Sequence, residues 1–132
     1  MKVKLKTLLN ARESLSILNH TKGLGVVTAY RIMKNVDTVE KELKYYDKKN
    51  LELCEKYGVR DDKARLIVEN GVCNIKIECA EQFREEEKEL KKLLDETVEI
   101  SIVKIDIEAL DKAGLAPAQL AAIEFMLNIK EE

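Results

Sequence analysis

The sequence contains few of the side chains that carry out acid–base or nucleophilic catalysis. His20 is the single histidine, and no Gly-x-Ser-x-Gly, phosphate-loop, His-Glu-x-x-His or EF-hand pattern occurs. His20 falls near the expected end of a helix, where the helix dipole favours a cation, so we interpret it as a capping or surface residue. The many carboxylates have no predicted pocket to position them. The sequence therefore predicts a protein that is not an enzyme, with no catalytic residues and no cofactor.

The three cysteines do not form a metal-ligand pattern. Cys54, Cys73 and Cys79 show no Cys-x-x-Cys spacing, and His20 alone adds too few ligands for a zinc site. Cys73 and Cys79 are expected about 20 Å apart on one strand, which is too far for a disulfide. We therefore expect three buried, reduced thiols and no metal.

Positive charge is concentrated near the start of the chain. Residues 1–34 carry seven basic side chains and one acidic one, a net charge of +6, although the whole chain has a net charge of −2. Such asymmetry indicates either an anionic partner or a dipolar surface that aids self-association. With two Phe, no Trp and no recognition-helix motif, nucleic-acid binding is the weaker interpretation. The candidate anion or nucleic-acid contacts are Lys2, Lys4, Lys6, Arg12, Lys22, Arg31 and Lys34.

The composition indicates an ordered, helix-rich protein. Hydrophobic residues make up 45% and charged residues 36% of the 132 residues, with one Pro and five Gly. No apolar run approaches the length of a membrane span, and no signal-peptide pattern is present, so we expect a cytoplasmic protein without membrane association. We draw no domain boundary and expect one domain, 1–132.

A long helix over 26–57 dominates the predicted fold. Its positions at alternating steps of three and four are apolar except for Asn50, as in a coiled-coil seam: Ala29, Ile32, Val36, Val39, Leu43, Tyr46, Asn50, Leu53 and Tyr57. At 1.5 Å per residue the helix is about 48 Å long, so we expect it to project or to pair. A first helix, capped by Thr7 and ending near residue 19, packs against its proximal part after the turn at Gly23 and Gly25.

The remaining pattern predicts an α+β fold. Alternating runs around Asn70-Gly71 predict a β-hairpin over 63–79 that pairs Val68 with Cys73, and a further strand is predicted over 97–107 with a phase slip. We expect these segments, with an added strand at 2–6, to form one small antiparallel sheet. Helices are expected over 80–96, over 108–113 with a cap at Asp106 and a stop at Gly114, and from Pro117 onward.

The distal part of the long helix is the best functional lead in the sequence. The first helix has about 13 residues and covers about 20 Å, which leaves the stretch from Leu43 to Tyr57 without an assigned cover. We interpret this stretch as a surface for self-association or for a partner protein. The candidate partner-binding residues are Leu43, Tyr46, Asn50, Leu53 and Tyr57.

Five short segments resemble a family of small proteins encoded by phages and prophages of Gram-positive bacteria. They are LLNARESL at 8–15, AYRIMKN at 29–35, KYG at 56–58, NG at 70–71 and LAAIEFM at 120–126. The resemblance implies a phage or prophage accessory protein in the host cytoplasm that acts by binding. It leaves three functions open: an assembly accessory that binds a virion component, an inhibitor of a host enzyme such as a defence nuclease, and a nucleic-acid-binding protein that uses the basic N-terminal region.

Overall fold

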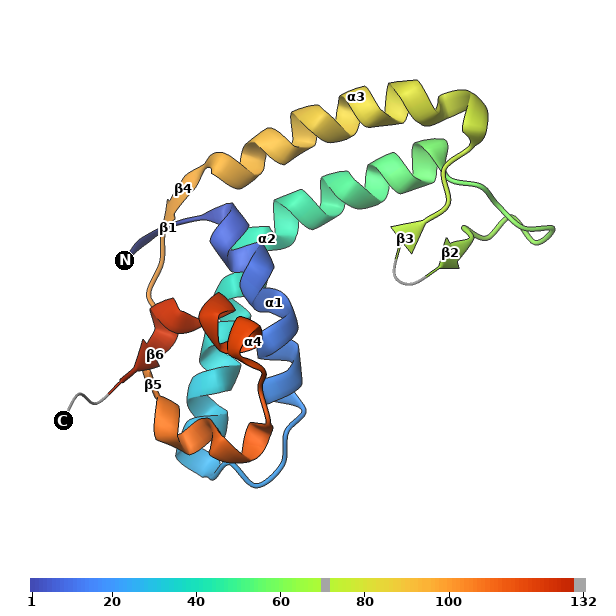
Figure 1. Cartoon of the computed structure of the whole chain (residues 1–132). Coiled ribbons are helices and arrows are strands. Elements are labelled where there is room, and N and C mark those ends of the chain that lie inside the picture. Colours follow the sequence, from blue (N-terminus) through green and yellow to red (C-terminus); the bar gives the residue numbers. More distant parts are fainter. Residues whose placement is uncertain (70–71, 130–132) are drawn as a thin grey trace. The chain divides into compact units, whose positions relative to one another are not determined.

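The protein is α+β, as expected from the sequence, and Figure 1 shows the order of its elements. The structure, a computed structural model, describes residues 1–69 and 72–129. The chain forms two compact units: unit 1 consists of Met1–Leu43 and Thr97–Glu132, and unit 2 consists of Lys44–Glu96. The boundary between Leu43 and Lys44 lies inside the long helix, so no change of composition in the sequence marks this boundary.

Unit 1 is built on three helices: α1 (Leu5–Asn19), the first part of α2 (Val26–Tyr57) and α4 (Pro117–Ala122). The predicted bounds of α2 and the start of α4 at Pro117 are confirmed. Helix α1 begins two residues before Thr7, so the predicted cap at Thr7 is wrong. The side chains of Leu8, Ala11, Leu15 and Leu18 line one face of α1 and are at most 2% exposed, because steps of three and four keep them on the same side of a helix.

Among the described residues the strands form three separate pairs instead of one sheet. In unit 1, β1 (Lys2–Lys4) pairs antiparallel with β4 (Thr97–Glu99), and β5 (Ile105–Asp106) pairs parallel with β6 (Leu127–Asn128). The segment predicted as a single strand over 97–107 is therefore two strands with different partners, and the phase slip between them reflects that change. Ile100 and Ile105 are both buried, at 5% and 0% exposure.

The C-terminal segment completes the core of unit 1. The helical turn η3 (Ile107–Ala113) ends at Gly114, whose φ of 67° is the left-handed conformation expected of such a stop. Asp106 occupies the predicted position before this turn, but its side chain makes no capping hydrogen bond; its Oδ1 accepts one from Asn128 Nδ2 at 3.0 Å instead. After α4, the turn η4 (Glu124–Met126) leads into β6 and places three apolar side chains, Ile123, Met126 and Leu127, in the core.

A buried amide joins α2 to the irregular segment between β4 and β5. Asn35 is fully buried, at 0% exposure. Its Nδ2 donates to the Val103 carbonyl oxygen at 2.8 Å, and its Oδ1 accepts from the Val103 backbone N–H at 2.9 Å. The Asn35 side chain thus satisfies the backbone N–H and C=O of a residue that lies outside any strand, and its own buried amide is satisfied in return.

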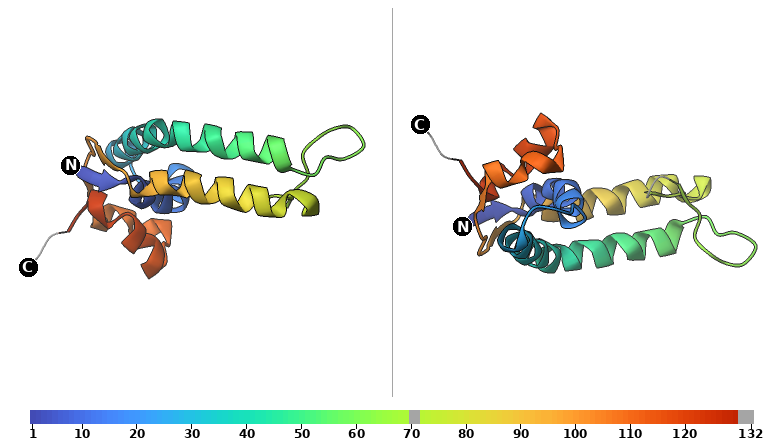
Figure 2. Two further views of the ribbon diagram at one scale, coloured as in Figure 1. Left: turned by 90° about the horizontal axis from the view of Figure 1, so that it is seen from above. Right: turned by 90° about the horizontal axis from the view of Figure 1, so that it is seen from below.

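Unit 2 is a pair of helices closed by a loop. The distal part of α2 lies beside α3 (Ala80–Lys91), which continues into the turn η2 (Lys92–Asp95), and the views of Figure 2 agree on this arrangement. Lys56 Nζ lies 3.1 Å from Glu86 Oε1, and the rings of Tyr57 and Phe83 meet edge to face at 6.2 Å. The distal seam, to which the sequence assigned no cover, is therefore covered within the chain by α3.

The hairpin in the closing loop is shorter than predicted. Strands β2 (Val68–Glu69) and β3 (Val72–Cys73) pair in the predicted register, Val68 with Cys73, while the turn predicted at Asn70-Gly71 lies outside the described residues. Beyond this pair the strands separate, because Leu66 pairs with Arg60 and Ile75 pairs with Gly58. Residues 77–79, predicted as strand, form the helical turn η1 (Ile77–Cys79).

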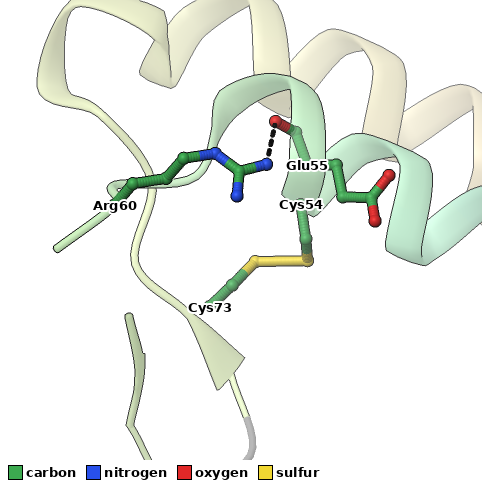
Figure 3. Close-up of a disulfide and its surroundings, with 4 residues drawn as sticks. All are labelled: Cys54, Glu55, Arg60 and Cys73. Carbon is green, nitrogen blue, oxygen red and sulfur yellow. Dashed lines mark hydrogen bonds between the residues drawn. A yellow bond between two sulfur atoms is a disulfide. The ribbon is translucent and has the colours of Figure 1, made fainter. Parts of the chain in front are cut away.

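A disulfide joins Cys54 on α2 to Cys73 on β3, with their Cα atoms 6.1 Å apart (Figure 3). The expectation of three reduced thiols is wrong for this pair, and Cys79 remains a free, half-buried thiol. The same loop is held by Arg60, whose Nη2 donates to the Glu55 carbonyl oxygen at 3.5 Å. The pairing depends on the loop folding back onto the helix, a contact that no spacing in the sequence reveals.

Two further residues fix the path of this loop. Asp61 Oδ1 accepts hydrogen bonds from the backbone N–H groups of Lys63 at 2.9 Å and Arg65 at 3.0 Å. Gly58, which directly follows the end of α2, does not have the left-handed φ that is common at helix ends. Its requirement is space, since a Cβ built there would collide with the Cys54 carbonyl oxygen and lie 2.5 Å from Leu66 Cδ2.

Candidate functional site

The five candidate partner-binding residues of the seam differ widely in exposure. Leu43 and Tyr57 are buried, at 0% and 7% exposure; Tyr46 and Leu53 are half-buried; and Asn50 is exposed. Tyr46 and Asn50 line a cavity of about 280 Å³ beside the disulfide, whereas Leu53 lines a groove between α2 and α3. The structure thus divides the five residues between core and surface and does not bring them together as one apolar face.

The seven candidate basic contacts lie in separate places. Lys2, Lys4 and Lys6 are exposed on β1 and at the start of α1. Lys22 belongs to the turn after α1, and Arg31 and Lys34 belong to the first turns of α2. This turn lies at the C-terminal end of α1, which is about 22 Å long, whereas the first three lysines lie at its N-terminal end. Arg12 lies between the two groups, and its Nε is 3.0 Å from Glu40 Oε1. The basic residues therefore form two clusters instead of one continuous patch.

The second of these clusters borders an exposed apolar surface at the start of α2. Four large apolar side chains there remain in solvent: Val26 at 87% exposure, Val27 at 63%, Tyr30 at 54% and Met33 at 44%. We refer to these four residues as the α2 face. Isolated exposed apolar residues are normal on proteins, but neighbouring ones on one helix face are typical of a binding surface.

Helical geometry explains why these side chains point outward. Ile32 and Asn35 are buried on the side of α2 that faces the rest of unit 1. With 3.6 residues per turn, positions 26, 30 and 33 follow each other at steps of four and three on the opposite side. The core is thus satisfied by one stripe of α2, and the α2 face is a second stripe with no packing role in the described structure.

The sequence on either side of the α2 face is positively charged. No acidic residue occurs between Glu13 and Asp37, and α2 has none in its first turn. Lys34 Nζ lies 5.6 Å from the centre of the Tyr30 ring, within the range of a cation–π contact. In the described part of the chain, no ion pair involves Lys22, Arg31 or Lys34. The surface therefore combines apolar contact area with unneutralised positive charge.

The remaining observations give no chemical function to the described residues. No group of three or more His, Cys, Asp or Glu side chains among them is arranged to hold a metal ion. Within the same residues, no helix is both long enough and apolar enough to cross a membrane. Comparison of the chain with protein-family models, with curated proteins and with solved structures finds no match.

Sequence reasoning passed over the α2 face because it assigned the long helix to one seam. Val26, Val27, Tyr30 and Met33 all lie off that seam. The signal that points to them is a second apolar stripe on the same helix, limited to its first two turns and free of acidic residues.

Proposed function

We propose that the protein acts by binding another protein through the α2 face, without a catalytic step of its own. The observation that carries this proposal is the exposure of Val26, Val27, Tyr30 and Met33 on one side of a helix whose other side buries Ile32, Asn35 and Val39. Tyr and Met are enriched in protein interfaces, where the ring supplies rigid contact area and the thioether adapts to the opposing surface.

The resemblance of the sequence segments to phage and prophage proteins suggests the setting. In that setting the protein is an accessory factor in the bacterial cytoplasm, and its partner is a virion component or a host enzyme such as a defence nuclease. Both are proteins, so both agree with an apolar docking surface.

Site-specific cross-linking tests the proposal. A photoactivatable residue is placed at Val27, and a matched one at Val72, which is similarly exposed, at 68% against 63%, but lies in unit 2. We expect a specific cross-linked protein from position 27 only. After that protein is identified and purified, Val27→Ser should weaken its binding about tenfold or more, because an apolar contact at the centre of an interface is lost. The control Val72→Ser should leave binding unchanged.

Two results contradict the proposal. One is equal cross-linking from positions 27 and 72, which indicates non-specific contact. The other is unchanged affinity of Val27→Ser for the purified partner, which shows that the α2 face is not the interface.

A further inference from the structure

We infer that the partner of the α2 face presents an acidic amphipathic helix, an inference that rests on the proposed function above. Two independent properties of this surface point to such a partner: its apolar stripe and the positive charge beside it.

The positive charge beside the α2 face indicates a negatively charged partner. Lys22, Arg31 and Lys34 lie on or beside the first turns of α2, and no acidic side chain in the sequence neighbourhood offsets them before Asp37. Like charges across an interface are strongly unfavourable, whereas opposite charges steer association and fix orientation. Carboxylates that flank the partner's apolar stripe would meet these three cations.

The shape of the α2 face indicates that the partner contributes a helix. The α2 face runs from Val26 to Met33, which is two turns and about 10 Å of helix. A convex stripe of this length, with side chains at steps of three and four, packs against a complementary stripe on a second helix. The exposed Tyr30 ring and the flexible Met33 side chain are the expected anchors.

The same two properties disfavour other occupants. A two-fold pairing of two copies through this face would set the three cations of one chain against those of the other. A lipid surface is usually entered by Trp, Phe or Leu side chains, and the α2 face has none of them. Nucleic acid would use the cations but would leave Val26, Val27 and Met33 in water, with Tyr30 as the one aromatic ring for stacking.

Designed peptides provide the probe. Three labelled 18-residue peptides are compared by fluorescence anisotropy with the full-length protein: an amphipathic helix with a Glu-rich polar face, the same apolar stripe with a Lys-rich polar face, and the Glu-rich composition with its apolar positions scrambled. We expect only the first peptide to bind, with a Kd that rises about tenfold from low to physiological ionic strength because the contact is partly ionic.

Variants of the protein separate the two properties. Replacing the three cations together (Lys22→Glu, Arg31→Glu, Lys34→Glu) should abolish binding of the Glu-rich peptide and create binding of the Lys-rich one. Val27→Ser should lower the affinity for the Glu-rich peptide about tenfold, and Val72→Ser should leave that affinity unchanged. All of these side chains lie at the surface or are half-buried, so circular dichroism of each variant should match that of the wild type.

The outcomes distinguish this inference from the proposed function. Equal binding of the scrambled acidic peptide, or preferential retention of anionic vesicles or duplex DNA, overturns the inference. If none of the peptides binds, the inference is also overturned. The proposed function still stands in that case if Val27→Ser weakens binding of the purified cross-linked partner. If Val27→Ser is neutral toward both the purified partner and the peptide, both ideas fail.

Discussion

Asn35→Ala should be among the most destabilising single changes in unit 1. The side chain has no solvent exposure, and both polar atoms of its amide are satisfied by the backbone of one residue, the C=O and N–H groups of Val103, at 2.8 and 2.9 Å. Alanine removes both hydrogen bonds and leaves the Val103 N–H and C=O groups without their partner. It also leaves a small void next to Met126, whose sulfur lies 3.6 Å from Asn35 Nδ2.

The expected cost follows from these contacts. Two hydrogen bonds lost from a part-buried site cost about 2–3 kcal/mol, and the void costs about 1 kcal/mol more. Alanine regains about 0.6 kcal/mol through its higher helix propensity. The net loss in the free energy of unfolding is therefore about 3 kcal/mol, which lowers Tm by about 10 °C for a chain of this length.

Urea and thermal unfolding followed by circular dichroism measure this loss, and Asn50→Ala is the matched control. It makes the same change on the same helix, but Asn50 is exposed, so no stability should be lost and helix propensity should add up to about 0.6 kcal/mol. Equal effects of the two substitutions, or a loss below about 1 kcal/mol for Asn35→Ala, would refute the reasoning. In Asn35→Asp a buried carboxylate faces the Val103 carbonyl oxygen, which raises its folded-state pKa. That variant should thus lose stability as the pH rises through the raised pKa.

Three further changes test unit 2. Reducing the disulfide, or replacing both cysteines (Cys54→Ser with Cys73→Ser), should lower the stability of unit 2 by about 3 kcal/mol, the chain-entropy value for a closed loop of this length. Thiol titration of the wild-type protein, unfolded without a reductant, should find one reactive thiol, and Cys79→Ser should leave stability unchanged. Backbone N–H groups lower the pKa of Asp61 below 3.8, so its contribution to stability is present above that pH and is lost as the pH falls through the lowered pKa; Asp61→Asn should flatten this part of the acid-unfolding curve, and an unchanged curve would contradict the assignment. Gly58→Ala should cost about 1–3 kcal/mol in urea unfolding because its Cβ has no space, and a neutral effect would show that the loop can shift.

The elements that the sequence predicts well are those encoded by local pattern. The bounds of α2 follow from the apolar repeat together with Gly25 and Gly58 at its ends, and the hairpin register follows from the alternation on either side of Asn70-Gly71. Gly114 in the left-handed conformation is likewise a local requirement. These features need no knowledge of what lies across the fold.

The features that escaped prediction depend on partners far apart in the chain. The seam pattern singled out Asn50 as the polar residue of interest, whereas the structure buries Asn35, whose partner Val103 is 68 residues away. The disulfide between Cys54 and Cys73 depends on how the loop returns to the helix. The cover of distal α2 by α3 was missed for the same reason, because the charged sequence of α3 shows little of its packing face.

The order in which the chain is made gives the two units different opportunities to fold. Unit 2 is one continuous stretch, so a ribosome has delivered all of its residues by Glu96. Unit 1 is formed by the two stretches on either side of unit 2, since its core includes Ile123 and Met126 and β5 pairs with β6. During synthesis, the side of α1 that packs against α4 therefore remains without this cover until residues 117–127 have been made, whereas unit 2 can fold before then.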